Sequence, residues 1–276
     1  MGMFDGARTE VRVDGSLAQE VFKVETNVSA ADSKKVEDML KEVVANAIPY
    51  VVPSKGHFYN GVSTVSLVPL TIGQVVDIEK VYSAKTAYEQ FAKFVGIVNG
   101  SVYGVKTLKL TMRDFYALCY NLRGLSYKND PIMVTISKQI SDRVVDLVSP
   151  VVASSIKTNN LDNFISNDNY DYLRVEDQLY LLENEDKLGQ YEKLYFAYVH
   201  GASPVEKLAN FRSLPADKFA ELLKYVYDAQ HGLQDIVQVK LPDTGELVEQ
   251  ELVFEYTMFF PSFIQENIYS NAIQAS

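Results

Sequence analysis

The chain has 276 residues, of which 47% are hydrophobic and 22% charged, a composition that favours a folded protein with one large core or two smaller ones. Its formal net charge of −10 argues against binding to nucleic acid, because the densest basic stretch is only Lys34–Lys35. A single cysteine, Cys119, excludes an internal disulfide and a metal site with several thiolates, and we expect it to pack in the core. No signal-like stretch opens the chain and no run of about 18 apolar residues occurs, so we expect a protein made and kept in the cytosol, without a membrane span.

Residues 1–28 are polar, lack helical periodicity and carry few bulky apolar side chains. We therefore expect an extended N-terminal arm, followed by a body at residues 29–276. Because such an arm gains little by folding on its own chain, we expect it to bind a neighbouring subunit; the alternative is a disordered or locally packed tail. On the first interpretation, deleting residues 1–28 leaves the body folded but impairs assembly with that neighbour.

Helices are expected where apolar residues recur at helical spacing next to capping signals. The signals are clearest at Thr111, which is followed three positions later by Asp114, and at Ser203–Pro204, which is followed by Glu206. In chain order, the expected helices are 32–47, 71–82, 86–98, 111–123 with Gly124 as its stop, 143–148, 175–182, 203–212, and 215 to Gly232, its stop.

Strands are expected where apolar and polar residues alternate between turn signals. The expected strands are 61–67, ended by Pro69, then 132–136, 235–241 and 246–254, and the last two are joined by a hairpin turn at Pro242–Gly245. Residues 53–61 and 158–171 have the composition of loops. The fold class is therefore α+β, predominantly helical with short β-hairpins, and residues 203–261 form a helix-plus-hairpin subregion. A circular dichroism spectrum dominated by strand would contradict this expectation.

Residue patterns that indicate catalysis or metal binding are missing from the sequence. His57, His200 and His231 are isolated, and His231 is expected in the last turn of a helix, where it complements the helix dipole. There is no phosphate loop, nucleophile elbow or dinucleotide-binding turn. One acidic run is expected to be solvated: Glu183, Glu185 and Asp186. We expect no catalytic residue, no cofactor and no zinc, although residues distant in sequence can still converge in space.

A set of motif positions falls in three segments, in order along the chain. The first runs from Pro53 to Thr71, the second from Leu110 to Tyr127, and the third from His231 to Pro261. The positions that carry the motifs are Pro53, Ser54, Lys55, Gly56, Tyr59, Pro69, Thr71, Asp114, Arg123, Ser126, Gly232, Pro242, Gly245, Phe259 and Phe260.

Together the three segments resemble the hub-assembly and baseplate protein family of T-even-type contractile-tailed bacteriophages. The resemblance implies a non-enzymatic component of the tail baseplate, at its hub, that binds other baseplate or tail proteins and is assembled in the bacterial cytoplasm. Two alternatives stay open: an assembly chaperone that leaves before the virion matures, and an enzyme whose site forms only in space.

The chain departs from the family pattern at the hairpin tip. Many relatives carry a pair of cysteines there that suggests a zinc knuckle, whereas this chain has Leu241 and Thr244. A hairpin without a metal clamp needs packing in its place, and we expect Phe254, Phe259 and Phe260 to supply it. The apolar cluster that follows the hairpin consists of Phe259, Phe260, Pro261 and Phe263. Its burial in the protein's own core predicts that Phe260→Ala costs about 3–5 kcal/mol of folding stability; the alternative is a groove on a partner.

Overall fold

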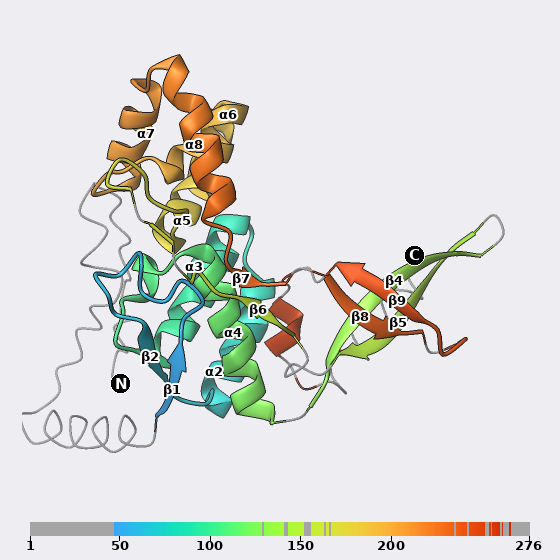
Figure 1. Ribbon diagram of the computed structural model, residues 1–276. Coiled ribbons are helices and arrows are strands. Elements are labelled where there is room, and N and C mark those ends of the chain that lie inside the picture. Colours follow the sequence, from blue (N-terminus) through green and yellow to red (C-terminus); the bar gives the residue numbers. More distant parts are fainter. Residues whose placement is uncertain are drawn as a thin grey trace, which may run out of the picture. The chain divides into compact units, whose positions relative to one another are not determined.

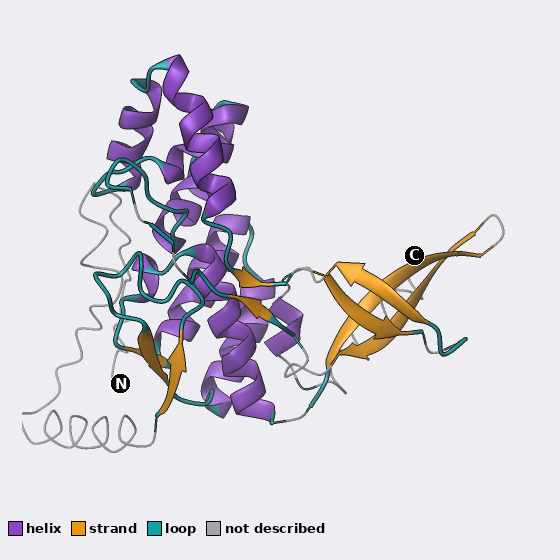
Figure 2. Cartoon of the chain, viewed as in Figure 1, coloured by secondary structure: helices purple, strands orange, loops and turns teal. Residues whose placement is uncertain are grey.

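The computed structural model describes residues 47–128, 130–140, 143–151, 156–162, 164–165, 167–234, 236–241, 243–251, 254, 256–259, 261 and 265. The expected arm, residues 32–46 of the helix expected at 32–47, Pro242, Phe260 and Phe263 lie outside these residues, and Ala47 itself is not helical. The described part combines seven α-helices with four small antiparallel sheets (Figures 1 and 2). The expected α+β class is therefore confirmed.

Helices occupy most of the positions that the capping signals indicated, and only the short α6 was not expected. The helices are α2 (Ile72–Tyr82), α3 (Ala87–Asn99), α4 (Met112–Tyr127), α5 (Val175–Glu183), α6 (Gln190–Tyr195), α7 (Pro204–Arg212) and α8 (Ala216–Asp228). Short 3₁₀ turns follow or precede them: η1 (Thr107–Lys109), η3 (Glu185–Lys187), η4 (Phe196–Tyr198) and η5 (Tyr256–Phe259). Among the described helices, none is long and apolar enough to cross a bilayer.

Local hydrogen bonds explain where these helices begin. The Thr71 hydroxyl accepts from the Gln74 amide, and the Gln74 side chain accepts from the Thr71 amide, which completes a capping box. Ser203 caps α7 in the simpler way, by accepting from the Glu206 amide. Two predicted ends are wrong: α4 does not stop at Gly124 but continues to Tyr127, and α8 ends at Asp228, before its expected stop at Gly232.

Every strand pair in the described part of the chain is antiparallel. In the first sheet β2 (Thr64–Leu67) lies between β1 (Ile48–Val51) and β3 (Val102–Tyr103). The other pairs are β4 (Ile132–Ile140) with β5 (Arg143–Val151), β6 (Thr158–Asn159) with β7 (Gly232–Leu233), and β8 (Ile236–Lys240) with β9 (Leu247–Glu251). The hairpin expected at 235–254 is thus confirmed.

The helix predicted at 143–148 is wrong, because these residues belong to β5. Pairing runs without a break from Ile132 opposite Val151 to Ile140 opposite Arg143. A short apolar run fits helical and extended periodicity equally well, and the abundance of valine favours the strand once a partner strand is present.

The largest core lies among the helices α2, α3 and α4. Phe94, Phe115 and Phe259 are fully buried there, and so is Cys119, as expected. Own-core burial is therefore confirmed for Phe259. Its ring centroid lies 4.9 Å from that of Phe94, and the Phe254 centroid lies 5.6 Å from the same ring.

The β8–β9 hairpin has a different packing partner from the one expected. Val237, Val239 and Leu241 of this hairpin form a cluster with Val151 of β5, and the Ser149 hydroxyl donates to the Lys240 carbonyl at 2.7 Å. Phe254 and Phe259 instead belong to the helical core, so the expectation that they hold the hairpin tip is wrong.

Candidate functional site

The first two motif segments meet at the buried carboxylate of Asp114, in the first turn of α4. The Ser54 amide donates to Asp114 Oδ1 at 2.9 Å, and the Tyr59 hydroxyl donates to Oδ2 at 2.6 Å. Thr111, the N-cap of α4, donates its own amide to the Tyr59 oxygen at 2.8 Å. In a capping box, the Asp114 carboxylate would bond the backbone amide of Thr111. Here it bonds the 53–61 loop instead.

His231 extends this network, and its predicted place in the last turn of a helix is wrong. α8 ends at Asp228, and the buried His231 ring lies between Ala229 and Thr111. Its Nδ1 faces the Ala229 carbonyl at 2.8 Å and so must donate, which leaves Nε2 to accept from the Thr111 hydroxyl at 3.0 Å. Burial lowers the pKa of His231, although the Asp114 carboxylate opposes the effect. The imidazole is therefore neutral and helps to hold the structure together.

A second buried hydrogen-bond network is centred on Arg123, which has no exposed surface. Its Nε donates to the Met258 carbonyl at 2.6 Å, while Nη1 and Nη2 reach the carbonyl and carboxylate of Asp130 at 2.8 and 2.7 Å. Nη2 also donates to the Pro131 carbonyl, and the guanidinium lies 5.0 Å from the centre of the Tyr127 ring. One side chain of α4 thereby joins the start of β4 to the third motif segment.

The remaining motif positions also have structural roles. The Ser126 hydroxyl accepts from the Leu70 amide at 2.9 Å, next to the Thr71 cap. Gly232 has a φ of +97°, and a Cβ there would lie 2.9 Å from the Cβ of Arg113. Other members of the set occupy turns or hairpin positions: Pro53, Lys55 and Gly56 in the first loop, Pro69 after β2, and Leu241, Thr244 and Gly245 at the hairpin.

A third polar cluster, which sequence reasoning missed, surrounds Lys207 of α7. Its buried ammonium lies 2.7 Å from Asp177 and 3.0 Å from Asp171, and Asp171 also pairs with Arg174. Burial raises the pKa of Asp177 to about 6, with the lysine opposing the effect. In the sequence, the only local sign of this cluster is that Lys207 lies next to Leu208 on the face that α7 buries.

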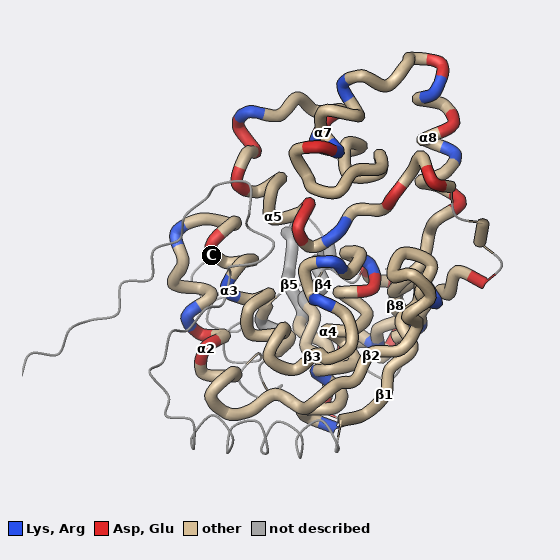
Figure 3. The backbone as a smooth tube through the Cα atoms, turned by 90° about the vertical axis from the view of Figure 1, so that its left-hand side faces the viewer, with Lys and Arg blue, Asp and Glu red and all other residues tan. Residues whose placement is uncertain are grey.

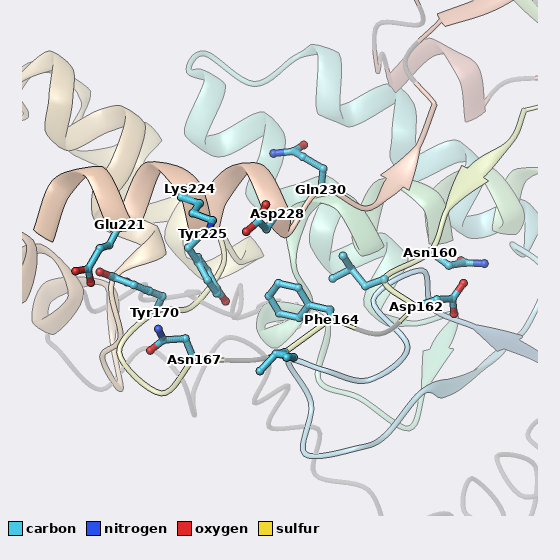
Figure 4. A pocket seen from close by; sticks show the side chains of 12 residues that line it. Asn160, Asp162, Phe164, Asn167, Tyr170, Glu221, Lys224, Tyr225, Asp228 and Gln230 are labelled. Atoms are coloured by element: carbon cyan, nitrogen blue, oxygen red, sulfur yellow. The ribbon is translucent and has the colours of Figure 1, made fainter.

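Two surface clefts adjoin this helical region. One of about 650 Å³ lies between α8 and the 160–170 segment (Figure 4). The other, of about 820 Å³, is lined by the 57–62 loop, Asp171, Arg174 and His200. Basic and acidic residues are interspersed along α7 and α8 (Figure 3), and no group of three or more His, Cys, Asp or Glu side chains in the described part of the chain is placed to bind a metal ion.

The acidic run at Glu183, Glu185 and Asp186 is exposed, as expected. Comparison with known proteins gives no further assignment, because no family model, no curated protein and no solved structure matches this chain.

Proposed function

We propose that the chain is a non-enzymatic structural component of a bacteriophage tail baseplate, at its hub, which acts by binding other baseplate or tail proteins. The observation that carries the proposal is the convergence of the three motif segments on Asp114 and Arg123. Residues of different segments bond to one another, which supports the view that the three segments act as one motif. Here Ser54 and Tyr59 of the first segment bond the Asp114 side chain of the second.

The third segment supports the same argument. Met258 and Phe259 offer their carbonyls to Arg123 and Tyr127, and the positive φ of Gly232 brings its backbone against Arg113. The motif residues therefore hold one fold together. A structural family can share such residues even when its members bind different partners.

The arrangement of polar groups favours a structural role over catalysis. Asp114, Arg123 and Lys207 are buried and bonded to other parts of the chain, so they face no substrate. In the larger cleft, Arg174 is paired with Asp171, and Lys109 with Glu176 at 2.6 Å. Of the Lys, Arg, Asp and Glu side chains that line this cleft, Asp168 alone is outside an ion pair among the described residues, and one exposed carboxylate has little to offer a reaction centre.

Quantitative mass spectrometry of purified virions tests the proposal, with the known tail proteins as stoichiometric standards and host ribosomal proteins as the measure of contamination. We expect this chain at a fixed ratio to the tail proteins. Its presence in isolated tail intermediates but not in virions would identify the alternative, a chaperone released before maturation. Absence from both would contradict the proposal.

A further inference from the structure

The cleft between α8 and the 160–170 segment has an aromatic floor. Tyr225 of α8 lies between Phe164 and Tyr170, with ring centroids 5.7 and 5.1 Å away (Figure 4). The two tyrosines are mostly buried, so their rings are fixed by packing and present a preformed surface. At the rim, the side chain of Ile165 is 87% exposed, which is unusual for a large aliphatic residue.

This cleft continues into the larger one beside it. Asn167, Tyr170 and Tyr225 line both, so the two adjoin at these residues and form one groove. Such a groove accommodates an extended segment of several residues better than a compact small molecule.

The groove is acidic. Its carboxylates are Asp162, Asp168, Asp171, Glu176, Glu221 and Asp228, and its cations are Lys109, Arg174 and Lys224. Six carboxylates against three cations leave a formal excess of three negative charges. Asp171, Glu176 and Glu221 are already in ion pairs.

Because Glu221 pairs with Lys218, which is not among the lining residues, the excess beyond the ion pairs is two charges, from the other three carboxylates against Lys224. Asp162, Asp168 and Asp228 are exposed, and none of them has a hydrogen-bond or ion-pair partner among the described residues. Unpaired carboxylates around an aromatic floor are the chemistry that recognises ammonium and guanidinium groups, which gain both charge pairing and contact with the ring faces.

We infer that this groove binds a basic, extended segment of a neighbouring subunit, with lysine or arginine side chains between the carboxylates and an apolar side chain against Ile165 and the rings. The inference rests on the proposed function, for which it names the chemistry of one partner. A nucleic acid does not fit, because the groove would repel its phosphates.

Fluorescence anisotropy with two labelled peptides tests the inference on the full chain. One probe alternates lysine and leucine over eight residues, and the other has glutamate in place of lysine. We expect the lysine probe to bind at low salt, to weaken as salt is added, and the glutamate probe not to bind. The variant Asp162→Asn/Asp168→Asn/Asp228→Asn should bind the lysine probe about tenfold more weakly, the sum of three exposed ion pairs.

The chain offers a matched control in its other exposed acidic run. Glu183→Gln/Glu185→Gln/Asp186→Asn removes the same charge away from the groove, and its affinity should stay within about twofold of the parent, since the exposed pairs are lost only in the groove variant. Ile165→Ser should weaken binding without a change in net charge. Equal losses of affinity for the lysine probe in both triple variants would mean nonspecific attraction and overturn the inference. So would displacement of the probe by millimolar spermidine to the same extent from the parent and from both triple variants.

Virion composition separates this inference from the proposed function. A groove variant that loses the peptide but enters virions at the parental ratio contradicts the inference and leaves the proposed function intact. A parent chain that is missing from virions and tail intermediates, but binds the lysine probe through the groove, contradicts the proposed function alone.

Discussion

Replacing Gly56 and Gly61 by alanine, one at a time, separates two physical effects within the first motif segment. Both glycines have left-handed backbones, with φ of +81° and +83°. They differ in their surroundings: a Cβ at Gly61 meets nothing within 4 Å, whereas a Cβ at Gly56 would lie 2.8 Å from the Val62 carbonyl carbon and 2.9 Å from the Ser63 nitrogen.

The magnitudes follow from these contacts. A left-handed backbone costs alanine about 1–2 kcal/mol, and the less flexible unfolded chain returns about 0.4–1 kcal/mol, so Gly61→Ala should destabilise the protein by about 1 kcal/mol. At Gly56 the clash is with backbone, which must move, and overpacking adds about 1–3 kcal/mol. Added to the cost of the left-handed backbone, this gives a total of about 2–4 kcal/mol.

Urea unfolding followed by circular dichroism measures both variants against the parent. Only the midpoints are expected to move, with the slope of the transition unchanged, because neither variant alters the surface exposed on unfolding. Equal destabilisation of the two variants would refute the reasoning, since it would mean that the loop yields to the Cβ at no cost.

Three further substitutions are predicted to change stability. Arg123→Leu should cost about 3–5 kcal/mol, measured by urea unfolding, because it removes the buried guanidinium that donates to the Met258, Asp130 and Pro131 carbonyls; a loss under about 1 kcal/mol would contradict this role of Arg123. Phe259→Ala should cost about 3–5 kcal/mol by removing the ring packed on Phe94, and a parental melting curve would show that the ring contributes nothing. Since burial raises the pKa of Asp177 to about 6, the native state retains a proton that the unfolded chain loses above about pH 4, so stability should fall as pH rises from about 4 to 6. Asp177→Asn should remove this decline, and an unchanged pH profile would contradict the assignment.

Helix starts were predictable from the sequence because their causes are local. Thr71, Thr86 and Ser203 each accept a hydrogen bond from an amide three residues along, and that spacing is visible in the sequence. Helix ends depended on the rest of the chain. Gly124 does not stop α4, because Ser126 bonds the Leu70 amide and keeps the helix going beyond the glycine.

Tertiary pairing also decided the two other errors. Residues 143–148 became a strand only because β4 lies opposite, and nothing within the run itself reveals that partner. His231 left the expected helix because Thr111, 120 residues away in sequence, offers its ring a hydrogen bond. The same distance problem hid the Lys207 cluster, whose aspartate partner Asp177 is 30 residues away.

The motif positions were predictable as a set, but not in their roles. The sequence placed Asp114 in a capping box, and the structure shows its carboxylate bonded to Ser54 and Tyr59. A capping signal describes only the backbone amide it satisfies, so it cannot reveal a second loop that reaches the same side chain.

The bond from Arg123 to the Met258 carbonyl, together with that from Tyr127 to the Phe259 carbonyl, has a consequence for synthesis in the cell. These partners are separated by 135 and 132 residues, so α4 and Asp130, the ion-pair partner of Arg123, leave the ribosome long before the segment that offers these carbonyls exists. Until then the Nε–H of Arg123 lacks the Met258 carbonyl and the Phe94 ring lacks the Phe259 ring that packs on it, which makes early closure unfavourable. The helical core should therefore stay open during translation and close late, in a single step. Fragments from interrupted translation would remain unfolded and open to proteolysis.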